Sequence, residues 1–177
     1  RKELNKYIRN LGFELLGYRD VPTHNVGVGE TALSVEPKAE QFFVKPIDFK
    51  GADALERRLA VLRKYANRTI HELYNQTYDS FYIATCSCRT IVYKGQLTTS
   101  QLKPYYTDLQ DQRMESALAL VHSRFSTNTF PKWKLAQPFR YIAHNGEINT
   151  IKGNVNWMKS KAAMLKNSLF TPEELEL

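Results

Sequence analysis

A short segment, residues 122–149, holds a permanently charged arginine and an amide-rich turn close together in the sequence. Arg124 follows an apolar run, and its guanidinium group offers a planar fork of donors that suits a carboxylate. The Ser-Thr-Asn run just behind it adds short donors. The structural alternative is an arginine that pairs with an acidic side chain of the protein itself. The residues therefore indicate an anion clamp at Arg124 and leave a structural ion pair open.

The pair Asn145-Gly146 follows a second apolar run, and an Asn-Gly pair in that position is first of all a turn signal. Its functional interpretation is that the asparagine amide and the glycine N–H point at one spot, where they would stabilise a developing oxyanion. Glycine also lets the backbone approach a substrate closely. A hairpin turn and an oxyanion hole both stay open at this point.

The sequence offers no obvious nucleophile to go with these groups. His122 and His144 each come just before one of them, where a catalytic base is conceivable, although a partly buried structural histidine is the simpler interpretation. No serine or cysteine lies in a nucleophile-elbow motif. Cys86 and Cys88 are predicted to lie within a strand as small buried hydrophobic residues, too close together for an unstrained disulfide. They lack the further ligands of a zinc site, and unpaired cysteines indicate a reducing compartment.

The composition is that of one globular domain. The chain has 177 residues, 42% of them hydrophobic, which is enough for a core, and no apolar run is long enough to cross a bilayer. The net charge of +7 invites a nucleic-acid interpretation. The basic residues are spread along helical patterns, however, and no RNA-recognition or zinc-finger signature is present. A basic nucleic-acid-binding module and a purely structural module are the alternatives to an enzyme.

The elements that position the candidate groups follow from hydrophobic periodicity. Apolar residues at helical spacing predict helices over residues 2–11, 52–74 and 149–165, with a short capped helix over 98–106. Thr171-Pro172 is typical of a helix start. Alternating or apolar runs predict strands over 13–21, 40–47, 80–95, 116–126 and 139–148. Trp133 and Trp157 are most simply core or lid aromatic residues.

Strands and helices alternate irregularly in this prediction, which favours an α+β fold with mostly antiparallel strands. Both candidate groups come directly after an apolar run. They are therefore expected in loops at strand ends, where a rigid scaffold presents chemistry.

Five stretches of the chain together resemble the amidotransferase domain of the glutamate synthase large subunit. In order, they are YRDVP, GETALSVEP, RTIVYKGQL, HSRFSTNTFPKW and AQPFRYIAHNGEINTIKGNVNWM. The HxRxxT and HNG elements alone are similar to those of class II glutamine amidotransferases in general. Their surroundings narrow the resemblance to glutamate synthase.

The resemblance implies a four-layer αββα N-terminal-nucleophile hydrolase fold with mostly antiparallel sheets. Residues 1–177 are expected to be a part of this domain that is incomplete at both ends. The family's nucleophile, a cysteine at the mature N-terminus, is expected upstream of Arg1, and an acidic substrate-binding residue beyond Leu177. Residues 1–177 alone are therefore expected to be inactive.

The implied reaction is hydrolysis of L-glutamine to glutamate and ammonia, and the ammonia is passed to 2-oxoglutarate for reductive glutamate formation. By resemblance, Arg124 clamps the substrate α-carboxylate and Thr127 contacts the substrate. Asn145 and Gly146 match the oxyanion hole. Glutamine carries a carboxylate at one end and a reacting amide at the other, which explains why a cation and an amide turn occur in one segment.

The resemblance also implies cofactors and partners outside this segment. FMN and an iron–sulfur cluster are expected in other domains of the complete protein, and no cofactor or metal in residues 1–177. Expected partners are the synthase domains of the same chain and either a small NAD(P)H-oxidising subunit or ferredoxin, whereas nucleic acid and membranes are not expected. The implied location is the cytoplasm, or a plastid in a photosynthetic eukaryote.

Overall fold

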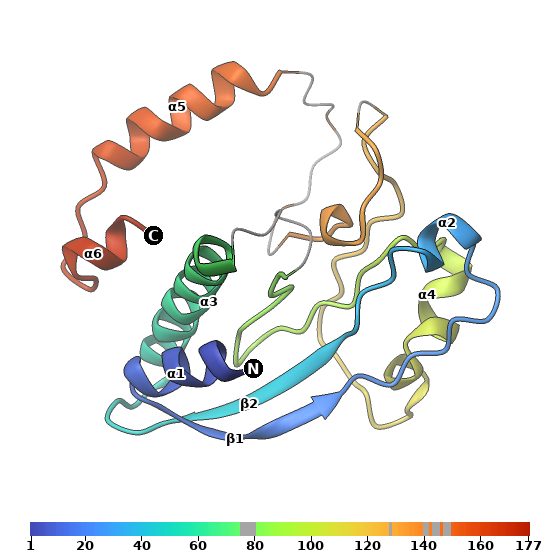
Figure 1. The fold of residues 1–177 in the computed structure, drawn as a ribbon, viewed down its shortest axis with the longest axis horizontal. Coiled ribbons are helices and arrows are strands. Elements are labelled where there is room, and N and C mark those ends of the chain that lie inside the picture. The colour runs from blue at the N-terminus through green and yellow to red at the C-terminus, as the bar shows by residue number, and fades with distance from the viewer. Residues whose placement is uncertain (75–80, 128, 140–141, 143–145, 147–149) are drawn as a thin grey trace. The chain divides into compact units, whose positions relative to one another are not determined.

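The computed structural model describes residues 1–74, 81–127, 129–139, 142, 146 and 150–177. They belong to two compact units, Arg1–Tyr141 and Ile142–Leu177. The second unit contains α5 (Lys152–Ala163) and α6 (Pro172–Leu175). The first contains, in order, α1 (Lys2–Asn10), β1 (Phe13–Asp20), α2 (Glu30–Leu33), β2 (Glu40–Pro46), α3 (Ala52–Tyr74), α4 (Thr99–Tyr105) and the 3₁₀ helices η1 (Thr107–Gln110) and η2 (Trp133–Leu135) (Figure 1). The fold class is α+β, as predicted.

The predicted helices and the first two predicted strands are confirmed. α1, α3, α4 and α5 fall within their predicted ranges, and β1 and β2 begin at the predicted residues. At the start of α4 the Thr98 N–H donates to Gln101 Oε1 at 2.8 Å, and at the start of α6 the Glu174 N–H donates to Thr171 Oγ1 at 3.3 Å. Such bonds satisfy N–H groups that a helix start leaves without a partner, so these boundaries follow from local sequence.

β1 and β2 pair antiparallel in a two-stranded sheet, with Phe13 opposite Pro46 and an irregularity between Leu15 and Gly17. Side chains alternate between the two faces of a strand. Phe13 and Leu15 face the core before the irregularity, and Tyr18 faces the core after it. The residues that face the core therefore have odd numbers before the irregularity and an even number after it. The bulge therefore keeps Phe13, Leu15 and Tyr18 on the core side of β1, whereas Leu16 is 59% exposed.

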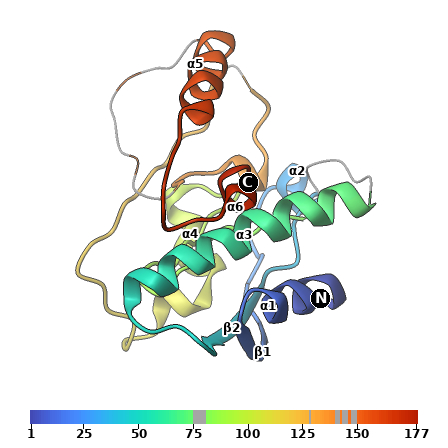
Figure 2. The same cartoon turned by 90° about the vertical axis from the view of Figure 1, so that its left-hand side faces the viewer.

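α1 and α3 lie beside the sheet and supply the other side of this first core (Figure 2). The apolar stripe of α1 includes Ile8, which is fully buried, and it meets Leu62 and Ala66 of α3, which are also fully buried. Tyr7 stands edge-on to Tyr65 with ring centroids 5.0 Å apart. The helical periodicity that predicts both elements thus also identifies the faces that they bury.

Gly12 joins α1 to β1 with a φ of +80°. This left-handed conformation costs an L side chain about 1–2 kcal/mol. The Gly12 N–H donates to the Arg9 carbonyl at 3.1 Å, and the Gly12 carbonyl accepts from the Ile47 N–H at 3.0 Å, so the turn is held on both sides. Gly12→Ala is expected to destabilise this region by about 1–2 kcal/mol. Hydrogen exchange of α1 and β1 in the full-length protein measures the loss as faster exchange.

Gly29→Ala is the matched control for this substitution. Gly29 has a φ of −65°, and an added Cβ would meet nothing within 4 Å. Exchange in α1 and β1 should therefore be unchanged by Gly29→Ala. Equal exchange in the two variants would show that the turn at Gly12 tolerates a side chain, contrary to the prediction.

A second buried cluster joins α2, α4 and η2. Its fully or nearly buried members are Val28, Tyr105, Tyr106 and Trp133. The Tyr105 ring stands edge-on to Tyr106 with centroids 4.7 Å apart and tilted to Trp133 with centroids 5.4 Å apart. Aromatic pairs in such arrangements add to the burial of their area. Of the two places expected for Trp133, a core or a lid, its burial shows the core.

The predicted strand over residues 80–95 is wrong for the described residues 81–95, which form no strand. Alternating apolar and β-branched residues predict an extended chain, but a strand also needs a main-chain partner. Here the N–H of Ile83 donates to Asn67 Oδ1 at 3.3 Å and that of Cys88 to Glu56 Oε1 at 2.6 Å. Side chains of α3 therefore accept bonds that a neighbouring strand would have accepted.

The predicted strand over residues 116–126 is also absent, and Leu118 and Val121 are 68% and 86% exposed. Within the described ranges no other segment pairs with this run. Of the run 139–148 the structure describes residues 139, 142 and 146, none of which lies in a strand. An apolar run becomes a strand only where a partner strand is beside it, and periodicity does not report the partner.

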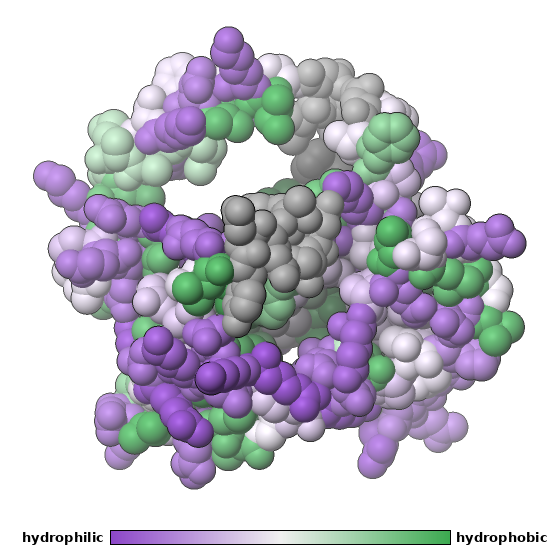
Figure 3. Space-filling model, viewed as in Figure 1, coloured by the Kyte–Doolittle hydropathy of each residue, from purple (hydrophilic) through white to green (hydrophobic). Residues whose placement is uncertain are grey.

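α5 confirms the predicted helix but exposes its predicted apolar side. Ile151 is 79% exposed and Met158 is 63% exposed. Trp157, at 78%, also lies outside a core. Figure 3 shows hydrophobic residues at the surface of this helix among hydrophilic ones. No helix in the described part of the chain has the length and hydrophobicity needed to cross a membrane.

Candidate active site

Arg124 lies in an irregular stretch of the first unit, and its side chain is exposed. Across the described residues, no hydrogen bond or ion pair joins this side chain to another residue. Arg113, earlier in the same stretch, instead pairs with Asp111 at 2.7 Å. The structural ion pair that the sequence leaves open for Arg124 is thus not formed within these residues. The guanidinium group remains available to a carboxylate from outside the chain.

Thr127 is an exposed turn residue in the same unit, three residues beyond Arg124. Gly146 is exposed and belongs to the second unit, and Asn145 lies outside the described residues. The structure therefore keeps Arg124 and Thr127 in one unit. The joint action of this pair with Asn145 and Gly146 stays a prediction.

His122 is exposed, which corrects its expected place as a partly buried histidine. The physical reason is that residues 116–126 form no strand against a second layer, so most side chains of this run are exposed. His144, the other histidine considered as a base, lies outside the described residues.

Several of the stretches that carry the family resemblance meet at the second cluster. Trp133 Nε1 donates to the Ala32 carbonyl at 2.9 Å, which ties the stretch beyond Arg124 to α2. The Tyr105 hydroxyl donates to Glu36 Oε1 at 2.5 Å and thereby ties α4 to the same stretch as Ala32. Residues 29–37 and the residues around Trp133 are therefore parts of one packed region.

The end of β1 joins this region through a charged network. Arg19 donates to Asp108 through two nitrogens, with Nη2 2.5 Å from Oδ1 and Nη1 2.9 Å from Oδ2, and the Tyr93 hydroxyl donates to Oδ2 at 3.0 Å. The hydrogen bond from Arg19 lowers the pKa of Asp108. Burial raises the pKa of Tyr93 to about 12, so it stays protonated and keeps donating at neutral pH.

Lys94 is buried at 7% exposure, although no carboxylate pairs with it among the described residues. Its Nζ donates to the Lys134 carbonyl at 2.7 Å and lies 4.4 Å from the centre of the Phe139 ring. The Tyr82 ring centre is 5.7 Å from the same nitrogen. Burial, with a contribution from the charge of Arg63, lowers the pKa of Lys94 to about 8. The ammonium is thus held by a carbonyl and aromatic faces, as in cation–π sites.

The two residues after Lys94 bind the same stretch at other points. A Cβ on Gly95 would lie 2.3 Å from Trp133 Cζ3, so only glycine fits against this ring. Gln96 Nε2 donates to the Pro131 carbonyl at 2.9 Å. From the sequence, Lys94-Gly95 is predicted only to end a strand. The one feature of the sequence that could have indicated a buried lysine is that Lys94 lies in an apolar, aromatic stretch.

Neither cysteine is placed as a nucleophile. Cys86 is half-buried against the first core, and burial raises the pKa of its thiol to about 12. Cys88 is exposed, which corrects its predicted burial, because the segment is not a strand. Its hydrogen bond with the Glu56 carboxylate raises the pKa of the Cys88 thiol. Both side chains therefore disfavour the reactive thiolate.

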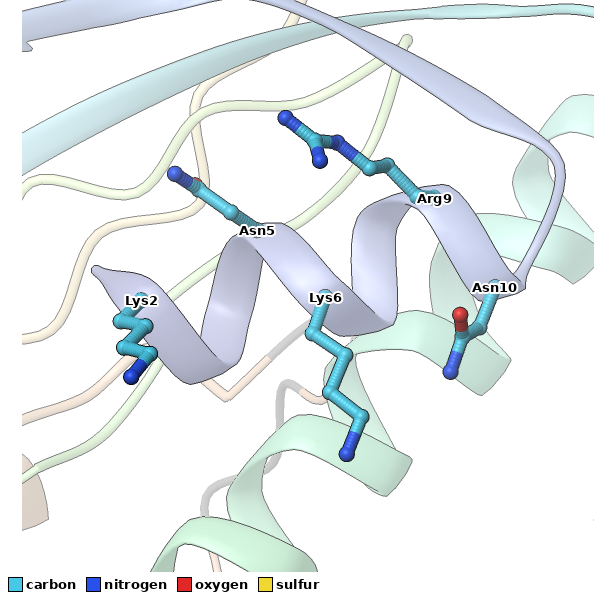
Figure 4. A pocket seen from close by; sticks show the side chains of 5 residues that line it. All are labelled: Lys2, Asn5, Lys6, Arg9 and Asn10. Atoms are coloured by element: carbon cyan, nitrogen blue, oxygen red, sulfur yellow. The ribbon is translucent and has the colours of Figure 1, made fainter.

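No group of three or more His, Cys, Asp or Glu side chains in the described part of the chain could hold a metal ion. A hollow in the surface is lined by residues of α1, and Figure 4 shows that its polar side chains all come from this helix: Lys2, Asn5, Lys6, Arg9 and Asn10. Arg124, Thr127 and Gly146 do not line it. The hollow is therefore not formed by the described candidate residues.

The chain is similar to glutamate synthases from distant organisms. It is 41% identical over 181 residues to ferredoxin-dependent glutamate synthase 2, chloroplastic, of Arabidopsis thaliana, covering 100% of this chain and 11% of the relative. It is 44% identical over 171 residues to the glutamate synthase [NADPH] large chain of Bacillus subtilis, covering 96% and 11%. For glutamate synthase [NADH] of Saccharomyces cerevisiae the identity is 44% over 169 residues, covering 93% and 8%. The chain thus spans about a tenth of the length of these relatives.

The family model for class-II glutamine amidotransferases matches residues 1–177. This match covers every stretch that carries the resemblance, including the exposed Arg124 and the Asn145-Gly146 pair. The chain therefore belongs to the class-II glutamine amidotransferase family.

Proposed function

We propose that this chain is part of the glutaminase domain of a glutamate synthase. In the proposed reaction, water and L-glutamine give glutamate and ammonia, and the ammonia is used to aminate 2-oxoglutarate. Family membership and the similarity to glutamate synthases support this assignment. Among the site residues, the observation that carries it is the exposed Arg124, which has no acidic partner in the described part of the chain.

The proposed roles follow the chemistry of glutamine. Arg124 binds the α-carboxylate through its planar fork of donors, and Thr127 adds a contact from the same stretch. Asn145 and Gly146 donate to the amide oxygen as it becomes negatively charged. The attacking thiolate is not assigned to Cys86 or Cys88, because both have a raised thiol pKa. In this proposal a cysteine of the complete protein, outside residues 1–177, supplies it.

The finer features of the fold and of the complete protein are proposals as well. We place the α+β units within a four-layer αββα domain, of which residues 1–177 are one part. FMN and an iron–sulfur cluster would belong to other domains. An iron–sulfur cluster is typically held by four cysteine thiolates, and the two cysteines of this sequence do not fit one. The complete protein would work with its synthase domains and either a small NAD(P)H-oxidising subunit or ferredoxin, in the cytoplasm or a plastid.

Isotope transfer in the full-length protein tests the proposal. Glutamine labelled with ¹⁵N in its amide is supplied with 2-oxoglutarate and, in separate reactions, with NADPH, NADH or reduced ferredoxin. We expect the label in the amino group of newly formed glutamate with one of these electron donors. Failure to release ammonia from glutamine would contradict the proposal. Salt-dependent binding to DNA or RNA without glutamine turnover would instead favour the basic nucleic-acid-binding alternative.

A further inference from the structure

The residues between Arg124 and Phe139 are held at several points by one tripeptide, Lys94-Gly95-Gln96. Lys94 Nζ donates to the Lys134 carbonyl at 2.7 Å, and Gln96 Nε2 donates to the Pro131 carbonyl at 2.9 Å. Gly95 packs against the Trp133 ring so closely that a side chain would not fit. We call residues 94–96 the support and residues 131–139 the supported segment.

The support is itself fixed in the second cluster. The Tyr106 hydroxyl donates to the Lys94 carbonyl at 2.7 Å in a buried bond, and Tyr106 is part of the edge-on tyrosine pair of that cluster. Trp133 adds its own bond to the Ala32 carbonyl. The support and the supported segment are thus both packed against the second cluster, whereas residues 116–127, which precede the supported segment, are largely exposed.

Burying the Lys94 ammonium group to bind a backbone carbonyl has a desolvation cost. Burying an ammonium without a paired carboxylate removes its hydration, and here the carbonyl of Lys134 and two aromatic rings are the groups that replace water. A lysine truncated at this position leaves the Lys134 carbonyl without that donor. We therefore expect a change at position 94 to act on the supported segment rather than on the surface.

Chain length links this geometry to the candidate site. Thr127 is four residues before Pro131, so their separation is at most about 14 Å. The position of the supported segment therefore limits where the end of the loop that carries Arg124 and Thr127 can lie. A misplacement of about 1 Å from a residue outside the reacting groups can cost about 10²-fold in rate.

We propose that Lys94 is a positioning residue for glutamine binding: through residues 131–139 it sets the position of the loop that bears Arg124 and Thr127. This inference rests on the proposed function. It adds a determinant of glutamine affinity that touches neither the substrate nor the reacting atoms.

The test replaces Lys94 with methionine, which keeps most of the chain's apolar length and removes the donor and the charge. In the full-length protein, kcat/KM for glutamine should fall about 10- to 100-fold, with KM carrying the larger part. Turnover with free ammonia as the nitrogen donor should stay within about twofold, because it bypasses glutamine binding. Hydrogen exchange should rise in residues 131–139 and stay unchanged in α1.

Lys103→Met is the matched control, since Lys103 is an exposed lysine of α4, beside the same cluster, and the same substitution there should leave all these values unchanged. Should Lys94→Met fail to fold, seen as a loss of ammonia-dependent turnover, Gln96→Ala is measured by the same criteria, because it removes only the bond to Pro131. Faster exchange in residues 131–139 with an unchanged KM for glutamine, in either variant, would overturn the inference. Absence of glutamine turnover in the unsubstituted protein would instead defeat the proposed function.

Discussion

Replacing Asn145 with alanine in the full-length protein is expected to lower glutamine-dependent turnover about 10²–10³-fold. Asn145 is proposed to donate to an oxygen that becomes fully anionic only in the tetrahedral intermediate. An interaction made mainly in the transition state appears in kcat and leaves substrate affinity largely intact. Steady-state kinetics with glutamine as the varied substrate measures both constants.

The competing explanation is that Asn145-Gly146 only shapes a turn. A turn defect would act through folding, so the melting temperature and ammonia-dependent turnover would fall together with glutamine-dependent turnover. Measuring all three in the same variant separates the two explanations. Normal glutamine-dependent turnover in a well-folded Asn145→Ala protein would remove Asn145 from the site.

Arg124→Ala is expected to impair glutamine use mainly through binding. A carboxylate enclosed in a site that loses its two-pronged arginine contact loses roughly 2–5 kcal/mol. At 1.36 kcal/mol per factor of ten, kcat/KM for glutamine should fall roughly 30- to 5,000-fold. Arg124→Lys should be impaired to a smaller extent, because it keeps the charge but loses the planar fork.

Arg113→Ala is the control for this prediction. Arg113 is an exposed arginine of the same irregular stretch, and it already pairs with Asp111. Its replacement removes an equal charge and should leave KM for glutamine unchanged. If Arg124→Ala also left KM unchanged while lowering the melting temperature, Arg124 would be structural, with an acidic partner outside the described residues.

The elements that rest on local interactions could be predicted from the sequence. α1 and α3 follow from apolar residues at helical spacing, and the starts of α4 and α6 from capping residues within three positions of each other. The boundaries of these helices depend on groups that are close together in the chain, so the sequence alone is sufficient to predict them. The candidate residue Arg124 and its chemistry could likewise be proposed from residue type and order, whereas Thr127 is identified through the family resemblance.

Tertiary structure decided the features that depend on partners distant in the chain. Residues 81–95 have the alternation of a strand, yet Asn67 and Glu56 of α3 accept their N–H donors and no strand forms. Burial, too, is not a property of one residue: Cys88 is exposed where the alternation predicts it buried.

Residues 94–96, the support, show most clearly that contacts between distant residues cannot be predicted from the local sequence. In the sequence, Lys94 stands at the end of an apparent strand, separated by 40 residues from Lys134, whose carbonyl it binds. The local pattern shows a lysine inside an apolar, aromatic stretch, but it does not show that this lysine is buried over the ring of Phe139. The residue types in the chain determined which chemical groups are available. Packing between distant segments decided which residues hold those groups in position. Burial and hydrogen-bond partners of this kind arise only when the chain folds, so the sequence alone does not show them.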